Sequence, residues 1–161
     1  KKEKGKTAPA IPKAVQSYLS DTSSFSPEWS GSILRMLPES ARDASPLLRE
    51  HLRILSAGIC IGETKGKDFI PAEELALSTA LCPEAFPVAD LDWDDAIRYL
   101  KKEALLLPAG TEKGYVLVRY KKFPLGFTKH LGNRANNLYP QEWRIRTGYV
   151  PEQVKTMLSL L

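Results

Sequence analysis

The side chains that most often carry enzyme chemistry are scarce and widely spaced in this chain of 161 residues. It has two cysteines, Cys60 and Cys82, and two histidines, His51 and His130. A structural zinc site with the usual ligand spacing needs four such side chains grouped in pairs, so the sequence excludes that framework. Cys82 has no histidine or lysine near it in sequence to activate its thiol, and Cys60 lies in a strand-like segment flanked by glycines. We expect both thiols to be packing residues.

Two further groups of residues have the types needed for chemistry but not the spacing. Gly58 and Gly62 border a strand-like segment, yet no helix begins directly after it, as a phosphate-binding loop would require. Asp92, Asp94 and Asp95 form an acidic cluster, which helix capping explains better than metal binding. The sequence therefore predicts no catalytic residue, no cofactor-binding residue and no metal site in this chain.

Charge is divided unevenly along the sequence. Residues 1–13 contain five Lys against one Glu, residues 14–97 contain six Lys and Arg against fourteen Asp and Glu, and residues 98–161 contain twelve Lys and Arg against four Glu. The basic last segment favours a polyanionic partner, with a merely solvated basic surface as the alternative. No apolar run approaches the ~18 residues that span a membrane, and no signal-peptide pattern begins the chain. We expect a cytoplasmic protein with no membrane partner.

Apolar periodicity in the first half predicts both helices and strands. Helical spacing of Val15, Tyr18 and Leu19 indicates a short helix, and the spacing of Trp29, Ile33, Leu34 and Leu37 indicates another that ends at Pro38. Alternating residues from position 57 onward predict a hairpin with its turn at 64–67. Pro71 is then expected at the first position of a helix that ends at Pro83.

The second half predicts one capped helix and a strong hairpin. Asp92 can cap a helix whose buried face carries Trp93, Ile97 and Leu100. Residues 114–120 are the best strand, followed by a turn at Lys121–Lys122 and a partner strand at 123–131. Weaker patterns predict short strands at 105–107 and 143–146, an irregular segment at 132–142 and a final helix from Pro151.

Cations alternate with aromatic residues throughout residues 113–149. Cations neutralise phosphates, while aromatic rings and Asn amides can stack on or read unpaired bases. Strand alternation places Tyr115, Leu117 and Arg119 on one face of strand 114–120, and Val116, Val118 and Tyr120 on the other, so some of the aromatic residues must belong to the core. The pattern favours nucleic-acid binding, with a structural β-module as the alternative.

Three motifs in this region resemble a known family. The segments Gly114-Tyr-Val-Leu-Val-Arg-Tyr, Phe123-Pro-Leu-Gly-Phe-Thr-Lys and Asn136-Asn-Leu-Tyr-Pro resemble the PUA-like module that ends RsmF-like RNA methyltransferases of the Nop/Sun class. Residues 54–77 resemble the small domain that precedes this module, so the resemblance spans about residues 50–147. The chain departs from the family pattern at Phe127, where Trp is usual, and at Asn136, where Lys is usual.

The resemblance implies a fold and a domain organisation. It implies an α+β fold with two small units, the C-terminal one a PUA-like β-barrel with flanking helices. The expected boundaries are a linker at 1–13, a small α+β domain at 14–87, the PUA-like RNA-binding domain at 88–150 and a C-terminal helix at 151–161.

The resemblance also implies a function. Enzymes of this class methylate carbon 5 of cytosine in ribosomal RNA, using S-adenosylmethionine and a catalytic cysteine in an upstream domain whose motifs are missing here. We therefore expect a non-catalytic region that holds RNA for that domain, with no cofactor or metal in this chain. The alternative is a protein-docking module that contacts a ribosomal protein or the catalytic domain. The expected RNA-binding residues are Arg119, Lys121, Lys122, Lys129, His130, Arg134, Asn136, Asn137, Tyr139, Arg144 and Arg146.

Overall fold

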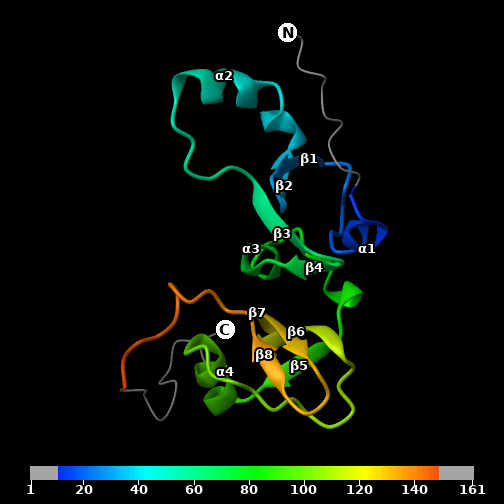
Figure 1. The fold of residues 1–161 in the computed structure, drawn as a ribbon, viewed down its shortest axis with the longest axis vertical. Helices are drawn as coiled ribbons and strands as arrows, with labels where there is room; N and C mark the ends of the chain where they lie inside the picture. Colours follow the sequence, from blue (N-terminus) through cyan, green and yellow to red (C-terminus); the bar gives the residue numbers. More distant parts are fainter. Residues whose placement is uncertain (1–10, 149–161) are drawn as a thin grey trace.

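Two four-stranded sheets make up most of the fold (Figure 1). The structure is a computed structural model that describes residues 11–148. Strand order is β1-β2-β3-β4 in the first sheet and β5-β6-β7-β8 in the second. The expected α+β class with a separate sheet in each half of the chain is confirmed. Within residues 11–148 the strands form two open sheets, and no closed barrel is found.

The first sheet is an antiparallel meander of β1 (Phe25–Ser30), β2 (Ile33–Pro38), β3 (Ile59–Lys65) and β4 (Asp68–Pro71). The helix predicted over residues 29–37 is therefore wrong. Leu34 pairs with Trp29 on one side and with Gly62 on the other, and both Leu34 and Met36 are buried. Sheet pairing on both sides outweighs the helical spacing, which is ambiguous in so short an apolar run.

Short helices surround this sheet. They are α1 (Lys13–Gln16), η1 (Glu39–Ala41), α2 (Ala44–His51), α3 (Glu73–Ala76) and η2 (Pro83–Ala85). The predicted helix near Val15 is present but ends at Gln16, before Tyr18 and Leu19. The helix expected from Pro71 to Pro83 is much shorter, because Pro71 is the last residue of β4 and α3 ends at Ala76. Leu77, the residue after α3, is exposed.

The second sheet contains the predicted hairpin at its centre. It consists of β5 (Val88–Leu91), β6 (Gly114–Tyr120), β7 (Phe123–His130) and β8 (Ala135–Asn137); β5 pairs parallel with β6 and the other pairs are antiparallel. Helix α4 (Trp93–Leu100) connects β5 to this hairpin, and the Asp92 carboxylate accepts from the Asp95 N–H as predicted. Its most buried residues are Ala96 and Tyr99, one position from the predicted face.

The weaker predictions for the second half fared less well. Strands β5 and β8 were not predicted, and β8 lies in the segment expected to be irregular. Residues 143–146 form no strand, and of residues 105–107 only Leu105 makes a bridge, to Ala135. Residues 1–10 of the linker expected at 1–13 lie outside the described residues, as does the final helix from Pro151, and Lys13 is already the first residue of α1.

Strand β6 has core on both of its faces. On one face, Leu117 joins Phe127, Leu34 and Ile61 in a cluster that holds the two sheets together. On the other, Val116 and Val118 pack with residues of α4. The alternation predicted for this strand is confirmed, and it places the basic hairpin between the first sheet and α4.

Candidate nucleic-acid interface

A row of three side chains crosses the second sheet near one end. The register pairs Tyr115 of β6 with Lys129 of β7, and Lys129 with Asn136 of β8. Directly paired residues project from the same face of a sheet, so the three side chains lie side by side. The ammonium of Lys129 lies 5.2 Å from the centroid of the Tyr115 ring, within the range of a cation–π interaction. An aromatic ring, a cation and an amide thus line up across three strands.

Lys129 also forms an ion pair with the first sheet. Its ammonium donates to Oδ2 of Asp68, the first residue of β4, at 2.6 Å. This hydrogen bond and the neighbouring Tyr115 hydroxyl raise the pKa of Lys129. Lys129 therefore stays positively charged at any physiological pH, and its charge is partly balanced by Asp68.

The other predicted cations divide between the two ends of the second sheet. Lys121 and Lys122 form the β6–β7 turn, where the ammonium of Lys121 lies 5.6 Å from the Tyr120 ring centroid. Arg134 is exposed in the turn between β7 and β8, where its carbonyl accepts from the N–H of Leu131. Since a strand advances about 3.4 Å per residue, the two ends of β6 lie about 20 Å apart. The cations therefore form two groups and not one cluster.

Two predicted RNA-binding side chains are held by contacts within the fold. The guanidinium of Arg119 makes two hydrogen bonds with Asp90, at 2.9 and 2.8 Å, which raise its pKa. His130 is buried, and its Nδ1 lies 3.0 Å from the carbonyl oxygen of Glu112. Each side chain therefore has a structural partner that RNA would have to replace.

The amide of Asn137 ties β8 to the end of α4. Its Nδ2 donates to the carbonyl oxygens of Tyr99 and Glu103, at 2.8 and 3.0 Å, and its Oδ1 accepts from the N–H of Tyr139 at 2.9 Å. The Tyr139 ring packs against those of Tyr99 and Trp143, with centroids 5.3 and 6.2 Å apart. Both predicted RNA-binding residues thus contribute to packing.

The last two predicted cations, Arg144 and Arg146, are exposed on an irregular segment. Between them, the N–H of Ile145 donates to the carbonyl of Leu100 at 2.9 Å, which fixes this segment to the end of α4. Both guanidinium groups are consequently available to a ligand that approaches from that side.

A buried acid between the sheets was missed by sequence reasoning. Glu73 of α3 is only 7% exposed, and its carboxylate lies 3.2 Å from the hydroxyl of Tyr99, which also lies 3.2 Å from the carbonyl of Phe127. Burial raises the pKa of Glu73 to about 7. The backbone at Gly126 approaches so closely that a Cβ there would lie 2.0 Å from Glu73 and 2.1 Å from the Tyr99 hydroxyl. The contacts among the Glu73 carboxylate, the Tyr99 hydroxyl and the backbone at residues 126–127 therefore connect α3, α4 and β7, and we call them the joint.

A shallow groove of about 360 Å³ begins beside this joint and includes Glu73, Lys102 and Leu138 in its walls. The ammonium of Lys102 donates to the carbonyl oxygens of Asn137 and Tyr139. Glu73, Lys102 and Asn137, which line the groove, already form hydrogen bonds within the protein. Their side chains therefore offer few free hydrogen-bonding groups to a ligand.

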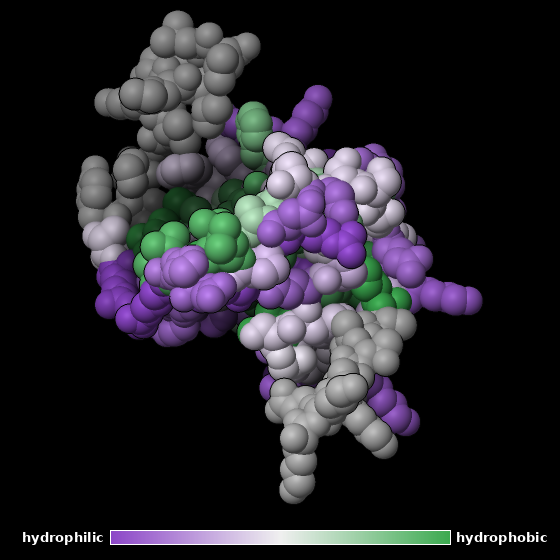
Figure 2. All heavy atoms as spheres, turned by 90° about the horizontal axis from the view of Figure 1, so that it is seen from above, coloured by the Kyte–Doolittle hydropathy of each residue, from purple (hydrophilic) through white to green (hydrophobic). Residues whose placement is uncertain are grey.

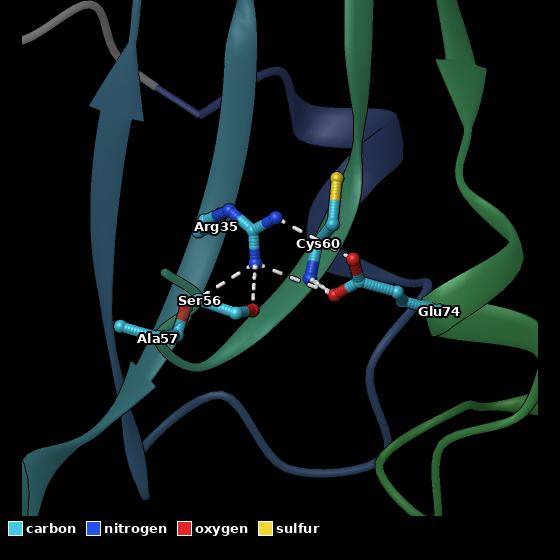
Figure 3. Close-up of polar contacts among 5 residues, drawn as sticks. All are labelled: Arg35, Ser56, Ala57, Cys60 and Glu74. Atoms are coloured by element: carbon cyan, nitrogen blue, oxygen red, sulfur yellow. Dashed lines mark hydrogen bonds and ion pairs between the residues drawn. The ribbon is translucent and has the colours of Figure 1, made fainter. Parts of the chain in front are cut away.

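A second polar network lies on the first sheet (Figure 3). Arg35 of β2 donates to both carboxylate oxygens of Glu74 at 3.4 Å and to the carbonyl of Ala57 at 3.3 Å, while Glu74 also accepts from the N–H of Cys60 at 2.8 Å. Burial raises the pKa of the Cys60 thiol, which makes it a poor nucleophile. These contacts fasten α3 and the segment before β3 to β2, and they give Arg35 a structural role.

The described part of the chain contains no group of three or more His, Cys, Asp and Glu residues arranged to hold a metal ion. Over the same residues, no helix has the length and apolar character needed to cross a membrane.

Comparison with known proteins finds similarity in the part of the chain that contains the second sheet. Residues 86–145 match the family described as the methyltransferase RsmF PUA domain. Relatives named "Ribosomal RNA small subunit methyltransferase F" from Shewanella baltica strains OS195, OS155 and OS185 are each 32% identical over 111 residues, or 66% of this chain. The chain spans only 23% of the length of these relatives. The resemblance predicted from the motifs is thus confirmed: residues 86–145 match the family of RsmF PUA domains.

Proposed function

We propose that this chain is the RNA-binding accessory region of a ribosomal RNA cytosine-C5 methyltransferase. The observation that carries the proposal is the family match of residues 86–145, which contain the row of Tyr115, Lys129 and Asn136 and ten of the twelve Lys and Arg residues of the basic segment 98–161. In this proposal the chain performs no methyl transfer itself. It holds substrate RNA so that a catalytic domain outside this chain, which binds S-adenosylmethionine, can reach the target base.

The row of Tyr115, Lys129 and Asn136 is the centre of the proposed RNA surface. A phosphate can accept from the ammonium of Lys129, and the exposed amide of Asn136 can hydrogen-bond to a base or a ribose. Arg134, in the neighbouring turn, adds a second cation at the same end of the sheet. The remaining predicted contacts at Lys121, Lys122, Arg144 and Arg146 extend this surface for a longer RNA. Arg119, His130, Asn137 and Tyr139 contribute to it chiefly by holding the backbone in place.

The proposal includes the domain organisation expected from the sequence. The first unit comprises residues 14–87 and the second residues 88–150, with closure of the second into a PUA-like barrel as part of the proposal. The proposed boundary falls between η2, which ends at Ala85, and β5, which begins at Val88.

The direct test is RNA binding as a function of salt. If about four cations contact phosphates, a plot of log affinity against log salt concentration should have a slope of about −3 to −4. The double variant Lys129→Glu/Arg134→Glu should bind a structured RNA at least tenfold more weakly. Arg53→Glu is the matched charge-reversal control, since Arg53 is exposed in the segment after α2. Binding that responds neither to salt nor to the double reversal would contradict the proposal.

One observation favours the alternative, a protein-docking function. Helix α2 buries none of its side chains, and Leu47, Leu48 and the following Leu52 are 60%, 44% and 59% exposed. The helix lies at the end of the molecule away from the second sheet (Figure 1), and a view from that end shows hydrophobic residues on the surface beside hydrophilic ones (Figure 2). Under this alternative, the surface of α2 docks on the catalytic domain. Leu47→Ser/Leu48→Ser should then weaken binding of an isolated catalytic domain and leave RNA affinity unchanged.

A further inference from the structure

The turn between β3 and β4 brings two lysines of the first unit next to the row on the second sheet. The register pairs Lys65 with Asp68, so Gly66 and Lys67 form a two-residue turn, and Gly66 has the positive φ of 64° that such a turn requires. Asp68 is the residue that ion-pairs with Lys129. Lys65 and Lys67 therefore flank the carboxylate that neutralises the central cation of the row.

These two lysines are available to a ligand. Both side chains are exposed, and neither forms an ion pair within residues 11–148. Their nearest acidic neighbour in sequence besides Asp68 is Glu63, which lies about 7 Å farther along β3 from Lys65. Two exposed lysines thus lie beside Asp68 in the chain, and a third, Lys129, is ion-paired with it where the two sheets meet.

We propose that Lys65, Lys67 and Lys129 form one phosphate-binding surface for RNA, and that Asp68 occupies it until a phosphate displaces the carboxylate. The inference rests on the proposed RNA-binding function and extends the surface to the first unit, whose overall charge is acidic. A carboxylate and a phosphate present similar anionic oxygens to an ammonium group. The side chains of Asp68 and Lys129 are 57% and 35% exposed, so solvent screens their attraction and an incoming phosphate can replace it.

This arrangement predicts opposite effects from neighbouring substitutions. Asp68→Asn removes the competing charge while keeping the side-chain shape, so it should tighten RNA binding at least threefold. Lys65→Glu and Lys67→Glu should each weaken binding at least threefold. A surface that binds RNA only through residues of the second unit would still respond to Asp68→Asn, because Asp68 pairs with Lys129 of that unit. It would not respond to the two lysine reversals, because Lys65 ends β3 and Lys67 lies in the β3–β4 turn, so these reversals are the decisive variants.

The experiment is fluorescence anisotropy with a labelled RNA hairpin of about 20 nucleotides, measured on the full chain at several salt concentrations. Asp43→Asn and Arg53→Glu are the matched controls, since both residues are exposed near α2 and should change affinity less than twofold. The double variant Lys65→Ala/Lys67→Ala should also make the log–log salt slope shallower by about 1.5, because two phosphate contacts are lost. This change in slope tests Lys65 and Lys67 separately from the Asp68–Lys129 ion pair, because the double variant leaves both residues of that pair in place.

The outcomes separate the inference from the function on which it rests. If the unmodified chain binds the hairpin but Asp68→Asn does not tighten binding and the lysine variants keep its affinity and slope, the inference is wrong and the proposed function stands. If the unmodified chain does not bind the hairpin at any salt concentration, both are wrong. Tighter binding by Asp68→Asn together with weaker binding by the lysine variants supports both.

Discussion

The two sheets differ in how much of each is buried, although both have four strands. In the second sheet, Val116, Leu117 and Val118 of β6 are fully buried, because one face of the strand packs on the first sheet and the other on α4. In the first sheet, Leu34 and Met36 face the shared core, whereas Arg35 between them carries an ion pair with Glu74. The comparison indicates that the second sheet holds the molecule together and that the first contributes mainly through one face.

The largest loss of stability is expected from a substitution at the joint between the two sheets. Gly126 has a φ of 150°, and a Cβ added there would lie within 2.2 Å of the Glu73 carboxylate and the Tyr99 hydroxyl. Because both groups are buried and cannot move aside, Gly126→Ala should lower the free energy of unfolding by about 4 kcal/mol or prevent folding. Urea denaturation followed by circular dichroism measures this loss.

Gly31→Ala is the control for backbone conformation alone. Gly31 lies in the turn between β1 and β2 with a φ of 60°, and nothing lies within 4 Å of the position of an added Cβ. Its substitution should cost about 1 kcal/mol, from backbone strain only. Equal losses from the two variants would show that packing at the joint contributes nothing.

A core truncation on β6 tests the difference between the sheets directly. Leu117 is fully buried among residues of both sheets, so Leu117→Ala should cost about 3 kcal/mol through lost burial and the cavity left behind. Ile33, at the start of β2, is 37% exposed, and Ile33→Ala should cost less than about 1 kcal/mol. Thermal unfolding of both variants measures the two losses of stability. A larger loss for Ile33→Ala than for Leu117→Ala would contradict the conclusion that the second sheet holds the molecule together.

The buried acid at the joint should make stability depend on pH. Burial raises the pKa of Glu73 from its ordinary value of 4.5 to about 7 in the folded chain. Between these two values the folded state retains a proton that the unfolded state has lost, so the free energy of unfolding falls as pH rises from 4.5 through 7. The expected decrease is about 2 to 3 kcal/mol, measured by urea denaturation at pH 5, 6, 7 and 8.

Glu73→Gln isolates this contribution. Glutamine has a similar shape and remains neutral, so the variant should lose most of the decrease in stability between pH 5 and pH 8. An unchanged pH profile would assign the dependence to other groups and show that the Glu73 carboxyl ionises freely in the folded chain.

The central hairpin of the second sheet was also the part of the fold that sequence patterns predicted best. Residues 114–120 are rich in β-branched and aromatic residues, and the hairpin they form was predicted almost to its ends. Residues 29–37 misled the same reasoning, because the spacing of Trp29, Ile33 and Leu37 fits a helix. They contain the end of β1 and most of β2, and only the pairing of β2 with β1 and β3 shows this. Strand β8 has three residues, too few for any periodic signal.

The candidate site was predicted in part. Lys129 was expected from its type and from the family motif, whereas Asn136 was expected although the family usually has Lys at that position. Their alignment with Tyr115 depends on the register of three strands, which no local pattern reveals. The contribution that we propose for Asp68, Lys65 and Lys67 comes from the first unit, whose acidic balance over residues 14–97 gave no sign of it. Sequence separation of 61 residues between Asp68 and Lys129 explains why this contact needed the structure.

The smallest change in stability is expected from a substitution in the β6–β7 turn, which differs from the β3–β4 turn in its residues with positive φ. The β3–β4 turn of the first sheet has glycine at its positive-φ position, whereas the β6–β7 turn of the second has Lys121 and Lys122 with φ values of 47° and 70°. Two-residue turns with positive φ at both positions favour Asn-Gly, because these residues adopt that backbone with less strain. Lys121→Asn/Lys122→Gly should therefore raise the free energy of unfolding by about 1 kcal/mol, measured by urea denaturation. The turn lies about 20 Å from Lys129, so this variant should weaken RNA binding less than Lys129→Glu/Arg134→Glu does. A loss of stability would mean that the lysines are favourable in this turn, through contacts such as that of Lys121 with the Tyr120 ring.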